Sequence, residues 1–320
     1  LLIRTLSEMR SVDLGFDTHN LLRLRVSLPG ERYPSEEQQL EFFERAEEQI
    51  RALPGVRSVA SVACIPLVGD SSNSALNIED FPVSNPADRF FVGNHSATPG
   101  YLETMGITLF EGREFTPLDR TDSQGVIIVN KLLAERFWPN ESALGKQVRF
   151  GRPDGDQPWL EIVGVMADYH QTSVQSEPRF ETLYPQAFYT SSAMDFVVRT
   201  EVSPESLIDE AQTVIWKIDP ELAVYNIETM DEIVERNVRS ADDLASLLGG
   251  FGIVALVLAL GGLYGMLSFS VGQRTQEIGV RMALGAQSRA VVASVLRKTA
   301  ALVAVGIVAG GAIAWLMSRW

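Results

Sequence analysis

Two long uncharged runs near the end of the chain constrain its fold more than any other sequence feature. Residues 244–273 are 30 consecutive positions without Asp, Glu, Lys or Arg, and residues 299–318 are 20 more. A hydrocarbon core of roughly 30 Å requires about 20 helical residues, so each run is long enough to cross a bilayer. Two buried helices of a soluble core are the alternative, but such helices rarely lack charges over this length. We therefore expect two transmembrane helices.

The charges divide the chain at the start of the first run. Residues 1–243 hold 21 Lys and Arg against 40 Asp and Glu, whereas residues 244–320 hold six basic residues and one acid, Glu277. Short loops rich in Lys and Arg stay on the cytoplasmic side, so the loop 274–298 is expected inside and the acidic part outside. Such acidity argues against a nucleic-acid partner, because phosphate binding requires clustered basic side chains.

No motif for catalysis, cofactor binding or metal binding stands out. The single cysteine, Cys64, cannot form an intrachain disulfide, and the three histidines lack metal-ligand spacing. The segment "ALGKQ" (143–147) is not a phosphate-binding loop, and no G-x-S-x-G, H-E-x-x-H or C-x-x-C string occurs. We expect no catalytic residue, no cofactor and no metal, and a membrane-tethered hydrolase has no supporting motif.

The acidic part is predicted to be an α+β domain of two small subdomains, with a boundary near 85–100 or 170–190. Alternation in residues 21–28 indicates a strand, Ser35 is a suitable N-cap for a helix over 36–53, and residues 56–64 return as a strand. The remaining predicted strands are 90–98, 125–130, 146–150, 160–168 and 195–200, and the remaining helices are 131–138 and 207–218.

One helix is predicted to connect this domain with the membrane. From Thr229 an apolar face continues without a proline into the first uncharged run. A helix over 229–273 has 45 residues and a length of about 67 Å, so more than half of it lies outside a bilayer as a stalk. The chain opens on Leu1 like a fragment, and residues 1–17 are expected to be the end of a first membrane helix and the second leg of the stalk.

Small residues and charges add detail to the membrane part. Gly261 and Gly265 form a small-xxx-small pair, as do Gly306 and Gly310, and such pairs favour close helix packing in lipid. In the loop, Glu277 and Arg281 are four residues apart in the favourable order, which predicts a short helix below the membrane. Positive charge that only fixes topology is the alternative reading, and it is sufficient for the basic residues of 289–298.

The segment "QRTQEIGVRMALGA" (273–286) closely resembles the loop motif of the MacB/FtsX-type ABC transporter permeases, an E-I-G-x-R-x-A-x-G-A string after the second membrane helix. The segments "VDLGFDTHNLLRLRVSLP", "LPGVRSVASVACIPL", "GREFTPLDR", "VIIVNKLLAERFWPNESALGKQVRFG" and "PRFETLYPQAF" resemble the periplasmic core domain of the same family. The chain is most similar to the second half of duplicated bacterial permeases that lack a fused ATPase.

This resemblance implies four membrane helices, of which the first and fourth are not in this chain, and a cytoplasmic coupling helix that contacts an ATPase. The implied parts are the end of the first membrane helix and stalk (1–17), a periplasmic core domain (18–228), a stalk and membrane helix (229–273), a coupling loop (274–298) and a membrane helix (299–318). The residues implied to contact the ATPase are Arg274, Glu277, Ile278, Gly279, Arg281, Met282, Ala283, Leu284, Gly285 and Ala286.

The leading hypothesis is a non-catalytic permease subunit, multi-pass in the bacterial inner membrane, that transmits ATP hydrolysis to a periplasmic domain for export or mechanotransmission. Its expected partners are a cytoplasmic ABC ATPase, a second permease half or copy, membrane lipid and, in a pump, a periplasmic adaptor. The alternative is a membrane-anchored binding or scaffold module without ATPase coupling. The sequence does not identify the substrate.

Overall fold

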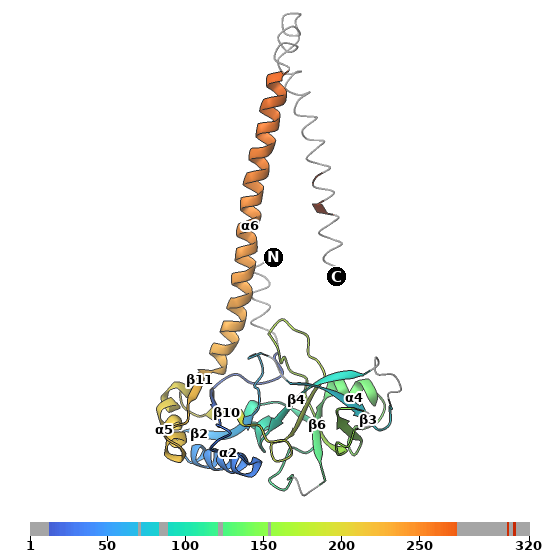
Figure 1. The fold of residues 1–320 in the computed structure, drawn as a ribbon, viewed down its shortest axis with the longest axis vertical. Helices are drawn as coiled ribbons and strands as arrows, with labels where there is room; N and C mark the ends of the chain where they lie inside the picture. Colours follow the sequence, from blue (N-terminus) through green and yellow to red (C-terminus); the bar gives the residue numbers. More distant parts are fainter. Residues whose placement is uncertain are drawn as a thin grey trace, which may run out of the picture. The chain divides into compact units, whose positions relative to one another are not determined.

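A mixed sheet of 11 strands organises the acidic part of the chain (Figure 1). The structure, a computed structural model, describes residues 13–69, 72–82, 89–120, 124–152 and 155–273, together with residues 306, 310 and 311. The chain divides into two compact units, which are residues 1–243 and residues 244–320. The first unit is a mixed α/β domain, in agreement with the predicted alternation of strands and helices.

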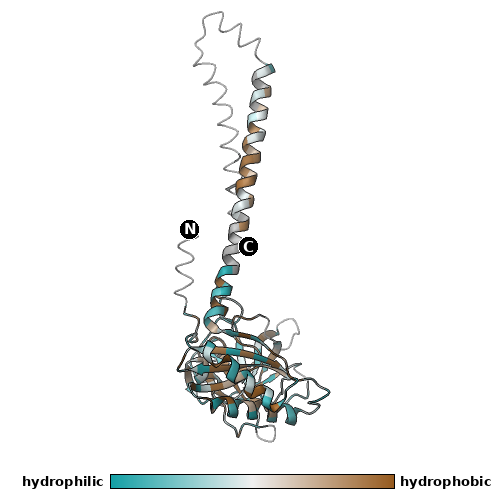
Figure 2. Ribbon diagram, turned by 90° about the vertical axis from the view of Figure 1, so that its left-hand side faces the viewer, coloured by the Kyte–Doolittle hydropathy of each residue, from teal (hydrophilic) through white to brown (hydrophobic). Residues whose placement is uncertain are grey.

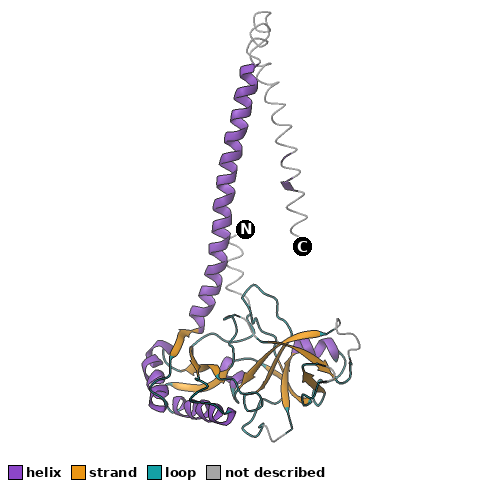
Figure 3. Cartoon of the chain, in the orientation of Figure 1, coloured by secondary structure: helices purple, strands orange, loops and turns teal. Residues whose placement is uncertain are grey.

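The strands, coloured orange in Figure 3, are β1 (Leu21–Ser27), β2 (Val56–Val62), β3 (Asn73–Ile78), β4 (Phe90–Ala97), β5 (Leu109–Gly112), β6 (Val126–Asn130), β7 (Gln147–Phe150), β8 (Leu160–Met166), β9 (Glu181–Pro185), β10 (Ala193–Thr200) and β11 (Val224–Thr229). The helices are α2 (Glu36–Arg51), α3 (Tyr101–Met105), α4 (Lys131–Phe137), α5 (Ile208–Ile218) and α6 (Met230–Gln273), and a 3-10 turn, η2 (Pro204–Leu207), precedes α5.

Four strands in the order β11-β1-β10-β2 form one half of the sheet. All neighbouring strands in this half are antiparallel. Strands β1 and β2 therefore run in the same direction, with β10 between them. Strands β10 and β11 also run in the same direction, with β1 between them. The predicted β-α-β unit over 21–64 is therefore a split unit, and two such units interlock. Helices α2 and α5 supply their connections and bury a shared apolar cluster that includes Leu22, Phe43, Phe196 and Ile215.

Local capping explains where α2 begins. The Ser35 hydroxyl oxygen accepts a hydrogen bond from the Gln38 backbone N–H at 3.3 Å, as the sequence predicts, and Ala52 ends the helix in the αR conformation. Glu36 and Glu37 occupy the first turn and Arg51 the last, which complements the helix dipole.

The second half of the sheet is an insertion between β2 and β10. It contains β3 to β9, and a further apolar cluster around Ile127, Leu133, Trp138 and Ile162 covers it on the side of α4. The chain leaves the four-stranded half after Val62 and returns at β10. The first crossing therefore lies well before the predicted interval 85–100, which β4 occupies, and the second lies just beyond 170–190.

Helix α6 is a single α-helix of 44 residues, about 66 Å long, in agreement with the predicted helix over 229–273. Figure 2 shows that its first turns are hydrophilic and its middle is hydrophobic. Residues Gly249–Met266 have a mean hydropathy of 1.8 and form the one helix in the described part of the chain that is long and apolar enough to cross a membrane. The second predicted span, 299–318, lies outside the described residues except for Gly306, Gly310 and Gly311.

Candidate functional site at the base of α6

Helix α6 begins with a reciprocal pair of hydrogen bonds. The Glu232 carboxylate accepts a bond from the Thr229 backbone N–H at 2.8 Å, and the Thr229 hydroxyl accepts one from the Glu232 N–H at 3.2 Å. This capping box satisfies two backbone donors that a helix start otherwise leaves unpaired. Since Thr229 is also the last residue of β11, the strand passes into the helix without a loop.

One face of the first turns of α6 is buried in the domain. Met230 and Ile233 are fully buried and Val238 is 8% exposed. They belong to one apolar cluster with residues from both halves of the sheet, including Val197 of β10 and Leu183 of β9. The Asn237 side-chain amide also donates a hydrogen bond to the Leu67 carbonyl oxygen at 2.9 Å. A displacement of the helix base therefore requires repacking of this cluster.

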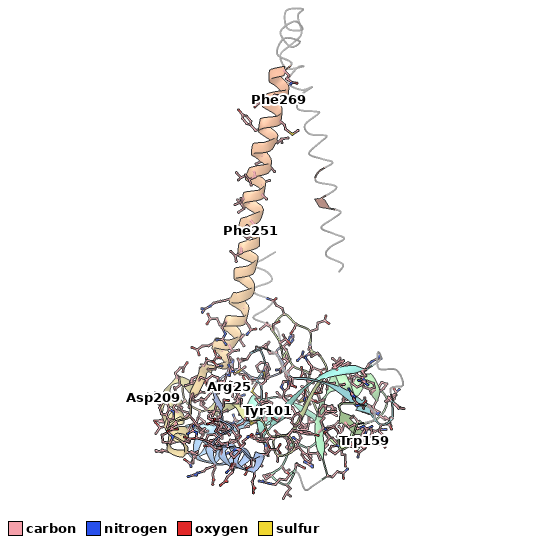
Figure 4. The ribbon with its side chains drawn as sticks, in the orientation of Figure 1. Arg25, Tyr101, Trp159, Asp209, Phe251 and Phe269 are labelled. Carbon is pink, nitrogen blue, oxygen red and sulfur yellow. The ribbon has the colours of Figure 1, made fainter. Side chains whose placement is uncertain are left out.

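A buried ionic network connects α6 to three strands. The Arg23 guanidinium of β1 contacts Asp195 of β10 at 2.7 Å and Glu228 of β11 at 2.6 Å. Arg25 pairs with the same aspartate, and Arg236 of α6 pairs with the same glutamate. Arg23 is 2% exposed and Asp195 is fully buried, so each charge depends on its partners for stabilisation. Figure 4 labels Arg25 in the domain below the first turns of α6.

The two carboxylates of this network respond differently to their surroundings. Burial raises the pKa of Asp195 above its ordinary value, and the guanidinium groups of Arg23 and Arg25 oppose that shift. Burial also tends to raise the pKa of Glu228, but hydrogen bonds from Arg236 and Arg23 outweigh it and hold this pKa below its ordinary value. Glu228 therefore remains ionised between the strand and the helix at neutral pH.

The segment that leads into β1 contacts α6 as well. The Thr18 hydroxyl donates a hydrogen bond to the Asp231 carboxylate at 2.6 Å, and His19 lies 3.8 Å from the same carboxylate. The expected second leg of the stalk, residues 1–12, lies outside the described residues. The contacts of Thr18 and His19 show that the chain reaches the base of α6 immediately before the first strand.

A second buried carboxylate belongs to Glu47 of α2, which is 6% exposed. The Thr98 hydroxyl donates a 2.7 Å hydrogen bond to it, and the Thr98 oxygen accepts one from the Ser61 N–H at 2.7 Å. Burial raises the pKa of Glu47 from 4.5 to about 7. This carboxylate therefore titrates near neutral pH at the point where α2 contacts the residue after β4.

The coupling residues predicted from the sequence, Arg274 to Ala286, lie outside the described residues, so their placement stays a prediction. A Cβ atom added at Gly261, Gly265, Gly306 or Gly310 meets no atom within 4 Å, and the predicted role of these glycines in helix packing stays a prediction too.

The network of Arg23, Asp195 and Glu228 was not predicted from the sequence. The available signal was arginine alternating with leucine in "LLRLRV" (21–26), since charge on the inner face of a strand requires a partner. Among the described residues, no group of three His, Cys, Asp or Glu side chains could hold a metal ion.

Comparison with known families agrees with this arrangement of a folded domain followed by a long apolar helix. The family model of the MacB-like periplasmic core domain matches residues 5–215, and that of the FtsX-like permease C-terminal region matches residues 249–320. A periplasmic core domain joined to such a membrane region defines the class of protein as a permease. The chain belongs to the MacB/FtsX-type ABC transporter permeases.

Curated relatives share modest identity with the chain. The uncharacterized ABC transporter permease YvrN of Bacillus subtilis is 23% identical over 68% of this chain, and the macrolide export ATP-binding/permease protein MacB of Mannheimia succiniciproducens is 24% identical over 72%. The matches span 56% and 37% of those proteins' own lengths. The solved periplasmic region of MacB from Actinobacillus actinomycetemcomitans is 15% identical, with a TM-score of 0.48 and coverage of 72% of this chain and 97% of that one.

Replacing Asp195 tests the network. We expect Asp195→Asn to lower the free energy of unfolding by about 3 kcal/mol, because it leaves the buried guanidinium of Arg23 with one carboxylate instead of two. The exposed Asp156→Asn is the control, with an expected change within about 0.5 kcal/mol. Urea unfolding of the full chain in micelles, followed by tryptophan fluorescence, measures both. Equal losses in the two variants contradict a stabilising network.

The raised pKa of Glu47 predicts that the free energy of unfolding depends on pH. Between pH 4.5 and about 7 the unfolded chain releases this proton while the folded chain retains it, so stability falls as pH rises through that window. The full effect is about 3 kcal/mol by order of magnitude. Wild-type stability relative to Glu47→Gln should therefore decrease between pH 5 and pH 8 in urea unfolding. The exposed neighbour Glu48→Gln should show no such trend, and a pH-independent difference for Glu47→Gln contradicts the shift.

Proposed function

We propose that the chain is a non-catalytic permease subunit that transmits ATP hydrolysis by a separate cytoplasmic ATPase to its periplasmic domain. In this proposal the loop 274–298 receives the movement, α6 conveys it across the bilayer, and residues 18–228 perform export or other conformational work in the periplasm. The observation that carries the proposal is the anchoring of one continuous helix with an apolar middle, through the buried face of its first turns, in an apolar cluster of the domain.

The apolar side chains of α6 support the proposal that this helix crosses the membrane. Large apolar side chains project from the helix beyond its first turns, among them Phe251 and Phe269, which Figure 4 labels and which are 71% and 69% exposed. A helix that is apolar on all sides is stable only in a membrane or against other helices. No proline interrupts residues 230–273, which form one continuous helix.

The proposed coupling loop, which is the cytoplasmic end of the transmission path, follows α6 directly in the sequence. Gln273, the last residue of α6, is also the first residue of the coupling motif 273–286. A docking helix in that loop would therefore join the membrane helix with few intervening residues. The positive charge of the loop favours its placement on the inner side of a bacterial cytoplasmic membrane, with the acidic domain in the periplasm.

The relatives support an ATPase as the driving partner. One matched protein is called an ABC transporter permease, and others are called export ATP-binding/permease proteins. In this proposal ATP hydrolysis belongs to a partner chain, and residues 1–320 contain no phosphate-binding motif. The glycine pairs of the membrane helices provide close-packing faces for a second permease half or copy. A periplasmic adaptor completes the assembly if it acts as a pump.

The coupling motif provides the test. We expect Glu277→Gln with Arg281→Gln to abolish most of the stimulation of a co-reconstituted ATPase. Loss of a charged interface pair typically costs about 2 kcal/mol, roughly a 30-fold loss of affinity. ATP hydrolysis in proteoliposomes, compared with the ATPase alone, measures the effect. The double variant removes one basic residue and one acid, so membrane topology should be retained.

The matched control is Arg289→Gln, which removes one basic residue from the same loop outside the motif. It should keep full stimulation, and protease protection should show the wild-type topology for both variants. Wild-type stimulation in the double variant would contradict ATPase coupling through this motif and favour the membrane-anchored scaffold module.

A further inference from the structure

The inserted half of the sheet contains a pocket that the proposed transmission path does not use. Its volume is about 310 Å³, which falls at the lower end of the range for small-molecule sites. It is lined by side chains from three strands, β3, β4 and β9, by the end of β7 and by neighbouring loops. The lining residues that matter for recognition are Ser74, Asn94, Phe150, Gln157, Tyr184 and Tyr189.

Asn94 is the feature that indicates a ligand. The residue is 9% exposed, and its side-chain oxygen is shielded from solvent without a hydrogen-bond partner. Leaving a buried amide oxygen unpaired costs about 1–3 kcal/mol, so a donor that reaches this oxygen would stabilise it. Because Asn94 lines the pocket, a ligand there could supply the missing donor after at most a rotation of the amide.

Three aromatic rings form the apolar part of the lining. The Phe150 and Tyr184 rings are 5.9 Å apart in an edge arrangement, and the Tyr184 and Tyr189 rings are 5.4 Å apart and nearly perpendicular. The Tyr189 hydroxyl donates a 2.9 Å hydrogen bond to the Gln157 side-chain oxygen, which connects the two residues across the lining. The pocket therefore combines ring surfaces with neutral hydrogen-bonding groups.

Charge narrows the class of ligand. Among the described residues that line the pocket, none is Asp, Glu, Lys or Arg, so no described side chain there balances a phosphate, a carboxylate or an ammonium group. A suitable ligand is neutral, carries several hydroxyl or amide donors, and has an apolar face for the rings. Sugar rings meet all three conditions, because their C–H faces pack on aromatic side chains while their hydroxyls point outward.

We propose that this pocket binds one unit of a neutral saccharide. A hydroxyl or acetamido N–H of the sugar donates to the Asn94 amide oxygen, the ring packs against the tyrosine pair, and Ser74 and Gln157 bond further hydroxyls. The site gives the periplasmic domain a ligand of its own, independent of ATPase coupling through α6.

Isothermal titration of the full chain tests this site. The protein is held in phosphatidylcholine nanodiscs, since many detergents carry a sugar headgroup, and is titrated with triacetylchitotriose and with maltotriose. We expect at least one of them to bind with a Kd of about 1 mM or tighter. Asn94→Ala should weaken binding by at least about tenfold without lowering stability, because it removes an acceptor that has no partner in the fold.

A second variant and a control variant show whether a loss of binding comes from the pocket. Tyr189→Ala removes part of the ring surface from a half-buried position and should also weaken binding by about tenfold. Phe91→Ala, which removes a 63% exposed ring on β4 outside the pocket lining, should bind as the wild type does. The proposal is overturned if neither sugar binds, if Tyr189→Ala and a folded Asn94→Ala keep wild-type affinity, or if a neutral tripeptide binds as tightly as the sugars.

Discussion

The buried contact between Arg23 and Asp195 constrains how the strands β1 and β10 pair. It joins β1, the first strand of the domain, to β10, across 172 residues of sequence that include the inserted half of the sheet. Both charges are almost completely removed from water, which is costly unless each is fully paired. Glu228 and Arg236 extend the pairing into the first turns of α6. The network therefore fixes one arrangement of strand, strand and helix.

The apolar cluster around this network connects the base of α6 to both halves of the sheet. Met230 and Ile233 enter a core that contains residues of both halves of the sheet, so the helix base cannot shift without repacking that core. Farther along, α6 exchanges charged for apolar side chains within the same unbroken helix. A permease that couples a membrane event to a periplasmic domain needs a continuous element of this kind, anchored in the domain at one end.

Local patterns in the sequence predicted much of the fold. The strands β1, β2, β4, β6, β7, β8 and β10, together with α2, α4, α5 and α6, follow from periodicity and caps that lie within a few residues of each other. Five elements were missed: β3, β5, β9, β11 and α3. Strand β9 ends in Pro185 and pairs in parallel with β4, and β11 contains Asn226 at φ 51°, so neither shows clean alternation. The pattern of Arg23 and Arg25 indicates that these charges need partners, but the partners were not predictable, because they follow from the register that sets Arg25 opposite Asp195.

Hydrogen exchange measured by mass spectrometry tests whether movement is transmitted through α6. The full chain, reconstituted with the proposed ATPase, is compared in nucleotide-free and ATP-bound states. We expect backbone protection to change in the first turns of α6, residues 230–238, and in β1 and β11, and we expect Glu277→Gln with Arg281→Gln to abolish these changes. A nucleotide-dependent change confined to residues 274–298, with 230–238 unaffected, would contradict transmission through α6.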